Sequence, residues 1–136
     1  QAHARQLDIL CAEDDRVNQL VIRALLKKMG HRIEIVDNGL EAVRALSQHD
    51  FDLVLMDGRM PEMDGKTATR MIRQGGLPEA RVRRSDVMIV ALTADASIHD
   101  EQEYLDAGMD AFLSKPIDEH RLHAVLQLAI DREVRD

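Results

Sequence analysis

The sequence predicts one α/β domain, with a parallel sheet covered by helices on both faces. Short apolar runs alternate with helical patterns five times along the 136 residues, which is typical of successive βα units. Residues 53–56 and 87–92 are apolar throughout, as central strands buried on both faces are. Hydrophobic residues make up 45% of the chain, enough for a folded core. We expect a linker at residues 1–6, the domain at 7–131 and a tail at 132–136.

The first half of the chain indicates its elements clearly. A strand covers residues 7–12, and apolar residues at helical spacing follow it until Gly30 ends the helix. Residues 33–36 alternate only in part, which indicates an edge strand. Asn38 caps the next helix, with a Glu three residues later that completes a capping box. After the third strand, Asp64 precedes another helix.

The second half contains one extended connection. Gly and Pro break the third helix, and a basic stretch runs through residues 75–86. We expect a solvated loop there, with a docking surface as the alternative. After the fourth strand, Ser97 opens a helix that Gly108 ends. A short strand at residues 111–113 and an amphipathic helix through residues 122–130 complete the pattern.

Composition and charge exclude several classes of function. With a net charge of −7 and 2% aromatic residues, the chain is unsuited to binding nucleic acid by phosphate neutralisation or base stacking. Its small basic cluster, Arg81, Arg83 and Arg84, is expected to be solvated. No stretch resembles a signal peptide or is long enough to span a bilayer. Cys11, the only cysteine, has no internal disulfide partner, which fits a reducing compartment, and we expect a small buried hydrophobe.

Polar side chains follow four of the predicted strands. Glu13 and Asp14 come after the first strand and Asp57 ends the third, while Thr93 ends the fourth and Lys115 follows the fifth. In an open parallel sheet, ligands bind outside the carboxyl ends of the strands. If the first and third strands are neighbours, Glu13, Asp14 and Asp57 converge in one crevice.

Such a convergence has an electrostatic consequence. Two carboxylates about 4 Å apart repel by roughly 4 kcal/mol at an effective dielectric constant near 20, so either one is protonated or a cation lies between them. Oxygen ligands favour a hard ion such as Mg²⁺. A carboxylate beside Mg²⁺ can accept a phosphoryl group, because the metal neutralises charge on the group in transit. Lys115 adds a positive charge for the same oxygens, and Thr93 adds a hydroxyl.

Each of these residues also has a structural alternative. The acidic residues 13–15 can form a helix-capping turn, and Asp57 can cap a turn because Gly follows it. Thr93 can cap the next helix, and a single lysine such as Lys115 is most often a solvated surface residue. We favour a common site because four such signals stand at the ends of different strands in one alternating fold.

These motifs together resemble a response-regulator receiver domain. The motifs are the acid pair after the first strand, Met-Asp-Gly-Arg-Met-Pro-Glu-Met-Asp-Gly at 56–65, Ala-Leu-Thr-Ala at 91–94 and Leu-Ser-Lys-Pro at 113–116. They occur in order, and the match covers about residues 7–130. The resemblance implies a flavodoxin-like (βα)5 three-layer sandwich whose five parallel strands have the order 2-1-3-4-5.

The resemblance also implies a phosphoacceptor site. In it, Asp57 accepts a phosphoryl group from a phosphohistidine on a partner. Glu13, Asp14 and Asp57 hold Mg²⁺, and the backbone carbonyl of Arg59 completes the protein ligands. The domain is then a switch that gains and loses its own phosphoryl group, rather than a turnover enzyme.

The resemblance assigns roles to the switch residues as well. Thr93 bonds the phosphoryl group and moves with it, while Lys115 pairs with the phosphoryl oxygens and is joined to Pro116 by a cis peptide bond. Phe112 takes the aromatic switch position, without the hydroxyl of the commoner tyrosine, and changes rotamer on activation. Arg59 and Asp95 tune the phosphoryl lifetime. The surface of the fourth helix, the fifth strand and the last helix switches.

Implied partners are a histidine kinase or a histidine-phosphotransfer domain. We expect a monomer or weak dimer in the cytoplasm, with no nucleic-acid or membrane contact by this fragment. The runs at 17–19, 61–65 and 91–94 look most like receivers of hybrid sensor histidine kinases, so the chain is expected to be the cytoplasmic receiver of such a kinase. Since it begins with Gln1, we expect a piece of a longer protein. A stand-alone response regulator, or a receiver cut from a larger regulator, is the alternative.

Two other classes of function stay open at this point. Phosphatases of the haloacid dehalogenase type also use an Asp nucleophile at a strand end, but they place a second Asp two residues later, where this chain has Arg59. The other class is an interaction module whose acids are structural, and such a module would have no affinity for Mg²⁺.

Overall fold

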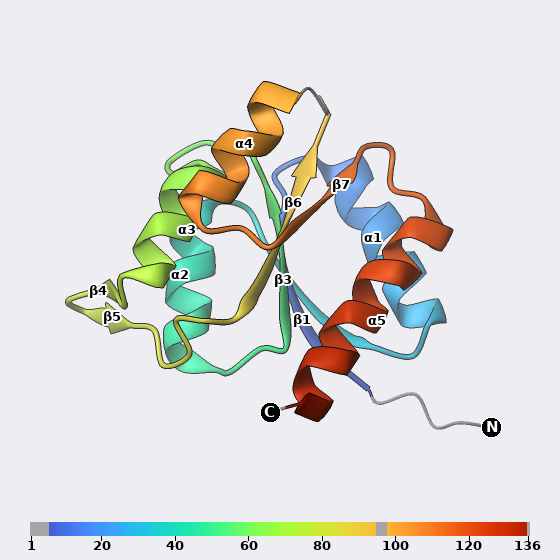
Figure 1. The fold of residues 1–136 in the computed structure, drawn as a ribbon, viewed down its shortest axis with the longest axis horizontal. Helices are drawn as coiled ribbons and strands as arrows, with labels where there is room; N and C mark the ends of the chain where they lie inside the picture. The colour runs from blue at the N-terminus through green and yellow to red at the C-terminus, as the bar shows by residue number, and fades with distance from the viewer. Residues whose placement is uncertain (1–5, 95–97, 136) are drawn as a thin grey trace.

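A five-stranded parallel sheet lies between two layers of helices in the computed structural model, which describes residues 6–94 and 98–135 (Figure 1). The strands of this sheet are β1 (Asp8–Ala12), β2 (Arg32–Val36), β3 (Leu53–Asp57), β6 (Met88–Thr93) and β7 (Ala111–Ser114). Their order is β2-β1-β3-β6-β7, and every neighbouring pair is parallel. This confirms the predicted fold class and the strand order that the resemblance implied. The two uniformly apolar strands, β3 and β6, have a neighbour on each side, and β2 is an edge strand.

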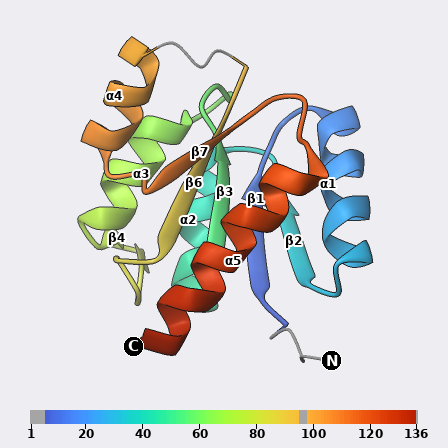
Figure 2. The same ribbon diagram turned by 45° about the vertical axis from the view of Figure 1, so that its right-hand side comes forward.

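Helices cover both faces of the sheet (Figure 2). The helices on one face are α1 (Arg16–Lys28) and α5 (Glu119–Arg135), and those on the other are α2 (Gly39–Gln48), α3 (Gly65–Arg73) and α4 (Ile98–Ala107). Alternate residues of each central strand enter opposite layers: Val54 packs with α2 and α3, whereas Leu55 packs with α1 and α5. Cys11 is fully buried on the face covered by α1 and α5. Burial raises the pKa of its thiol, so Cys11 acts there as a small hydrophobe.

Side-chain caps fix where three helices begin. The carboxylate of Asp15 accepts hydrogen bonds from the backbone amides at the start of α1. Asn38 accepts from the Glu41 amide at 2.9 Å, and Asp64 accepts from the Thr67 amide at 2.8 Å. These caps satisfy amides that have no partner within the helix, and they hold the loops at the carboxyl edge of the sheet. Ser97, the expected cap of α4, lies outside the described residues.

The stretch 75–86 differs from the expected solvated loop. It contains a small antiparallel hairpin of β4 (Gly76–Leu77) and β5 (Ala80–Arg81). Gly75 and Gly76 have φ values of +105° and +93°, which let the chain turn directly out of α3. Ala80 and Val82 are buried, and Val82 belongs to the core cluster that includes residues of α2. The prediction of an irregular loop was wrong for this hairpin because Ala80 and Val82 are buried. Arg81 and Arg83, which alternate with them, are exposed as expected.

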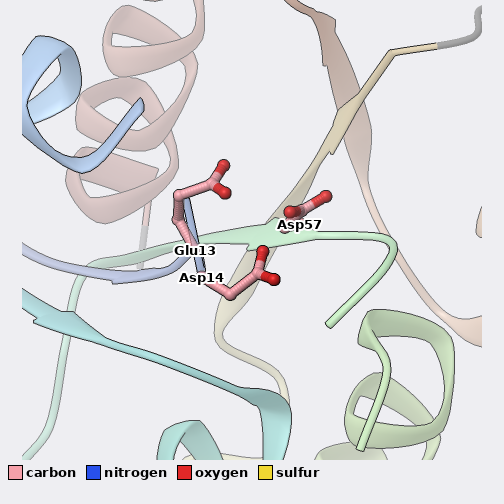
Figure 3. A group of neighbouring side chains, drawn as sticks. All are labelled: Glu13, Asp14 and Asp57. Carbon is pink, nitrogen blue, oxygen red and sulfur yellow. The ribbon is translucent and has the colours of Figure 1, made fainter. Parts of the chain in front are cut away.

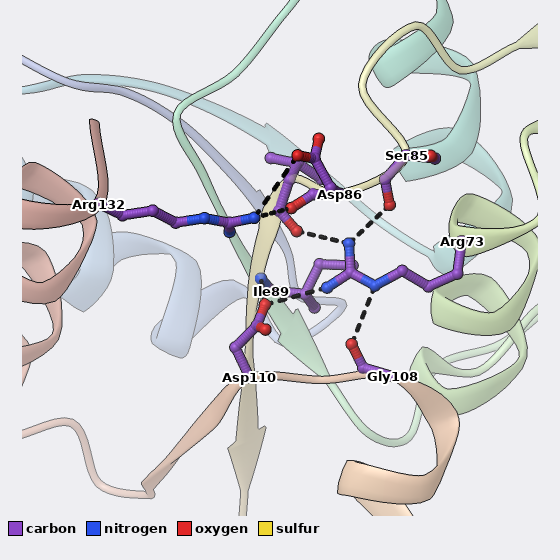
Figure 4. A network of polar contacts seen from close by, with 8 residues as sticks. Arg73, Ser85, Asp86, Ile89, Gly108, Asp110 and Arg132 are labelled. Atoms are coloured by element: carbon purple, nitrogen blue, oxygen red, sulfur yellow. Dashed lines mark hydrogen bonds and ion pairs between the residues drawn. The ribbon is translucent and has the colours of Figure 1, made fainter. Parts of the chain in front are cut away.

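One arginine joins three segments at the edge opposite the carboxyl ends of the strands (Figure 4). Arg73, at the end of α3, donates to the carbonyls of Ser85 at 2.8 Å, Val87 at 2.6 Å and Gly108 at 3.0 Å. Its guanidinium also meets Asp110 Oδ2 at 3.0 Å. We call these contacts the Arg73 network. It ties α3 to the segment before β6 and to the turn that follows α4.

The last helix extends further than expected. We placed the end of the domain at residue 131, but α5 continues to Arg135. Arg132 donates to the backbone carbonyl of Asp86, so this turn of the helix is tied to the start of β6 (Figure 4). No helix among the described residues has both the length and the apolar character that crossing a bilayer demands.

Candidate functional site

An open cleft of about 980 Å³ lies at the carboxyl edge of the sheet. The five side chains singled out at the strand ends all line it: Glu13, Asp14, Asp57, Thr93 and Lys115. They come from segments up to 102 positions apart in the sequence, and the order β2-β1-β3-β6-β7 is what brings those segments together. A parallel sheet therefore builds the site by aligning the ends of its strands.

Three carboxylates converge in this cleft (Figure 3). Glu13 and Asp14 follow β1, Asp57 ends β3, and one oxygen of each lies within 4.8 Å of an oxygen of the other two. Glu13 is fully buried and Asp57 is 6% exposed, whereas Asp14 is open to solvent. Hard oxygen donors at this spacing fit a small divalent cation, which takes one or two carboxylates and keeps several waters.

Lys115 lies between two of these acids. Its Nζ is 3.0 Å from Glu13 Oε1 and 3.1 Å from Asp57 Oδ2. Burial alone lowers the pKa of the Lys115 ammonium, but the hydrogen bonds and charges of the two carboxylates outweigh it and the pKa is raised. Lys115 therefore carries a positive charge, and its ion pairs with Glu13 and Asp57 fix its position.

The surroundings of Asp57 disfavour its ionised form. Burial, followed by the charge of Glu13, raises its pKa from 3.8 to about 6. Lys115 and the backbone amide of Arg59, which donates to Asp57 Oδ1 at 3.3 Å, limit the rise. A raised carboxylate pKa in a cleft is typical of functional sites, and a cation bound beside Asp57 would return it to the ionised form.

The remaining predicted residues lie around this centre. Thr93 ends β6 and is buried, and its carbonyl accepts from the Lys115 amide at 2.8 Å. The bond between Lys115 and Pro116 is cis. Phe112 lies on β7 opposite Ala91, half-buried against the layer of α2, α3 and α4, and it does not line the cleft.

The structure does not test the roles predicted for Arg59 and Asp95. Arg59 lines the cleft, and its carbonyl remains a predicted metal ligand. Asp95, expected to tune the phosphoryl lifetime, lies outside the described residues.

Lys66 and Tyr104 are among the cleft residues that sequence reasoning missed. Lys66 on α3 and Tyr104 on α4 both line it, and nothing in their linear neighbourhood relates them to Asp57. The available signal was Gly58, a glycine directly after the acceptor where the preceding strand is apolar. That signal indicates space to be filled, but the residue that fills it can be found only in three dimensions.

Comparisons with known proteins agree with this geometry. The model of the response regulator receiver domain family matches residues 9–127. The sensor protein GacS of Pseudomonas syringae pv. syringae is 44% identical over 118 residues, which are 87% of this chain and 13% of GacS. The chain thus spans about an eighth of that relative's length.

Two solved structures are also similar. The receiver domain of the sensor histidine kinase PA1611 from Pseudomonas aeruginosa PAO1, with magnesium coordinated in its active-site cleft, superposes with a TM-score of 0.82 and 39% identity, covering 93% of this chain and 99% of that one. The receiver of Ssk1 from Saccharomyces cerevisiae, crystallised with the phosphotransfer protein Ypd1, gives 0.76 and 32%, with 87% and 84% covered. The fold, the converging acids and the family match lead to one conclusion: this chain belongs to the response regulator receiver domain family.

Proposed function

We propose that this domain accepts a phosphoryl group on Asp57 from a phosphohistidine, in a Mg²⁺-dependent reaction. The observation that carries the proposal is the position of Lys115, whose Nζ lies within 3.1 Å of both Glu13 and Asp57 in a cleft open to solvent. A lysine held there neutralises the acceptor in the resting state, and it stands beside the oxygens that a phosphoryl group would bring.

Each residue of the cleft has a separate role in the proposed phosphoryl transfer. An oxygen of Asp57 forms the new bond to phosphorus as the nitrogen–phosphorus bond of the donor breaks, and the released imidazole takes up a proton. Glu13, Asp14, Asp57 and the carbonyl of Arg59 would hold Mg²⁺, which when bound supplies charge neutralisation for the phosphoryl oxygens. Lys115 pairs with one of these oxygens, and the hydroxyl of Thr93 bonds another.

The residues at the rim of the cleft support the proposal that the phosphoryl donor is a protein. Asp15 and Asn18, at the start of α1, line the cleft. On the same helix, Val17, Leu20 and Val21 are exposed, at 68%, 67% and 42%. Such an apolar patch beside a reactive centre suits a partner helix that presents a histidine. The similar Ssk1 receiver was crystallised with a histidine-phosphotransfer protein.

The proposed context is a hybrid sensor histidine kinase in which this receiver is the cytoplasmic part that relays the phosphoryl group. Support comes from relatives named as histidine kinases, including the sensor histidine kinase GacS of Pseudomonas protegens and the hybrid signal transduction histidine kinase B of Dictyostelium discoideum. The matched region makes up 12% of the first and 6% of the second. In this context, phosphorylation switches the surface formed by α4, β7 and α5.

The two competing classes find less support in the cleft. Arg59 lines it two residues after Asp57 and has no carboxyl group for acid–base catalysis, which argues against a turnover phosphatase. The pKa of Asp57, raised to about 6 by burial and by Glu13, argues against acids kept only for structure, since stability alone would favour an uncharged residue there.

The test is phosphorylation by acetyl phosphate with Mg²⁺, followed by intact-protein mass spectrometry. We expect one phosphoryl group on the wild-type chain, none after chelation of the metal, and none on Asp57→Asn. Full labelling of Asp57→Asn would remove Asp57 from the mechanism, and labelling that does not depend on the metal would remove Mg²⁺.

A further inference from the structure

A tyrosine of α4 occupies the space directly beside the acceptor. Gly58 follows Asp57, and a Cβ built on Gly58 would lie 2.2 Å from the hydroxyl oxygen of Tyr104 and 3.0 Å from its Cζ. Real Cβ atoms do not approach other heavy atoms this closely, so a side chain at position 58 and the phenol of Tyr104 exclude each other.

The reason for a glycine at this position is therefore steric. Gly58 is not among the glycines with positive φ, which are Gly30, Gly75, Gly76 and Gly108, so its backbone conformation is open to other residues. What the missing side chain provides is room for the Tyr104 hydroxyl. The pair links the loop after β3 to a helix 46 positions further along the chain.

Tyr104 is held in this place by its surroundings. Its side chain is 8% exposed, packs with the core layer of α2 and α3, and lines the same cleft as Asp57 and Thr93. The ammonium of Lys66 lies 5.6 Å from the centre of its ring and 2.5 Å from Glu103 Oε1. Two successive residues of α4 are thus engaged by groups that face the cleft.

These contacts would respond to a phosphoryl group. Phosphorylation adds up to about two negative charges and three acceptor oxygens at Asp57, the residue next to Gly58. Lys66 lines the cleft, so the new charge competes with Glu103 for its ammonium. The Tyr104 hydroxyl, which touches Gly58, has to follow any shift of that loop. Phe112, at the expected aromatic switch position, has no hydroxyl and does not line the cleft.

We propose that the Tyr104 hydroxyl, seated against Gly58, is the positioning group through which α4 responds to phosphorylation of Asp57. The inference rests on the proposed phosphoacceptor function and goes beyond it, because it names the residue that couples the acceptor loop to the helix. Tyr104→Phe removes one hydroxyl and keeps the ring, so the variant isolates this contact.

The chain offers a direct probe of this contact. Tyr104 is its only tyrosine, and there is no tryptophan, so tyrosine emission reports on Tyr104 alone. On treatment with acetyl phosphate and Mg²⁺, we expect the emission to change in proportion to the phosphorylated fraction measured by mass. In Asp57→Asn, which carries no phosphoryl group, the change should be absent.

The decisive measurement is amide hydrogen exchange along α4, before and after phosphorylation. We expect phosphorylation to change protection of α4 in the wild type and in Leu105→Ala, which alters a 45% exposed neighbour on the same helix. The change should be lost in Tyr104→Phe and in Gly58→Ala, whose methyl group displaces the phenol, although both still accept the phosphoryl group. If Gly58→Ala fails to fold, Tyr104→Phe alone decides.

The outcomes separate the two proposals. If the wild type is phosphorylated and Tyr104→Phe shows the same response in α4, the role of Tyr104 is overturned while the phosphoacceptor function stands. Unchanged tyrosine emission in a fully phosphorylated wild type overturns it as well. If Asp57 accepts no phosphoryl group under these conditions, both proposals fall.

Discussion

At the scale of single residues, the cleft works against the stability of the fold. Asp57 is held at 6% exposure near Glu13, and these two conditions raise its pKa to about 6. The folded chain therefore keeps the Asp57 proton up to about pH 6, whereas the unfolded chain releases it near 3.8. Between these values the folded state binds more protons, so ionisation of Asp57 lowers the free energy of unfolding as pH rises.

Because ionisation of Asp57 destabilises the folded state, Asp57→Asn is expected to stabilise it. At pH 7 without Mg²⁺, we expect the substitution to raise the free energy of unfolding by about 1–2 kcal/mol, because solvent in the open cleft screens part of the full effect. The gain should shrink towards pH 4, where the wild-type carboxyl is protonated, and it should also shrink when Mg²⁺ stabilises the wild type. Urea unfolding at both pH values measures it; a gain that grows towards low pH would contradict the assignment.

The partner residue gives a second prediction. Lys115 lowers the pKa of Asp57 through its charge and its hydrogen bond at 3.1 Å. Lys115→Met should therefore move the titration of Asp57 above pH 6, whereas Lys115→Arg, which keeps the charge, should move it less. Carboxyl ¹³C chemical shifts followed across pH report the titration directly. A titration that stays in place in Lys115→Met would mean that Lys115 does not influence the pKa of Asp57.

At the scale of elements, local signals in the sequence carry most of the fold. The caps at Asn38 and Asp64 and the apolar runs of β3 and β6 are determined by nearby residues, and each was predictable. The hairpin β4–β5 was missed because its strands are two residues long and depend on contacts with α2. The Arg73 network was missed for a similar reason: three of its four acceptors are backbone carbonyls, which leave no pattern in a sequence.

That network gives the third prediction. Arg73→Met keeps an unbranched stem like that of arginine but leaves three carbonyls and Asp110 without this donor. We expect a loss of about 2–4 kcal/mol in the free energy of unfolding, since bonds to a charged, half-buried donor are replaced only in part by water. Arg70→Met, at an exposed position of the same helix, should change it by less than about 0.5 kcal/mol. Equal effects of the two substitutions would show that the network adds nothing.

At the scale of the whole molecule, chemistry and anchoring lie at opposite edges of the sheet. The acids, Lys115 and Tyr104 line the cleft at the carboxyl ends of the strands. The Arg73 network lies at the other edge (Figure 4). The sequence located the five principal cleft residues because parallel strands align their ends. It could not locate Tyr104 or Lys66, since the packing of α3 and α4 against the cleft depends on distant contacts. The proposed response to phosphorylation would therefore take place at one edge, while contacts at the other edge tie the elements together.

The exposed apolar residues of α1 give a prediction about the whole surface. If a protein donor docks on α1 beside the cleft, Leu20→Lys should slow transfer from a phosphorylated histidine-phosphotransfer domain about tenfold, as loss of about 1.4 kcal/mol of apolar contact does. Labelling by acetyl phosphate, which needs no docking, should keep its wild-type rate.

The matched control is Leu128→Lys, which places the same charge on a 52% exposed leucine of α5. Rapid-quench transfer assays compare the three proteins. Equal slowing by both substitutions would indicate a general charge effect, and slower labelling of Leu20→Lys by acetyl phosphate would place its defect in the cleft rather than in docking.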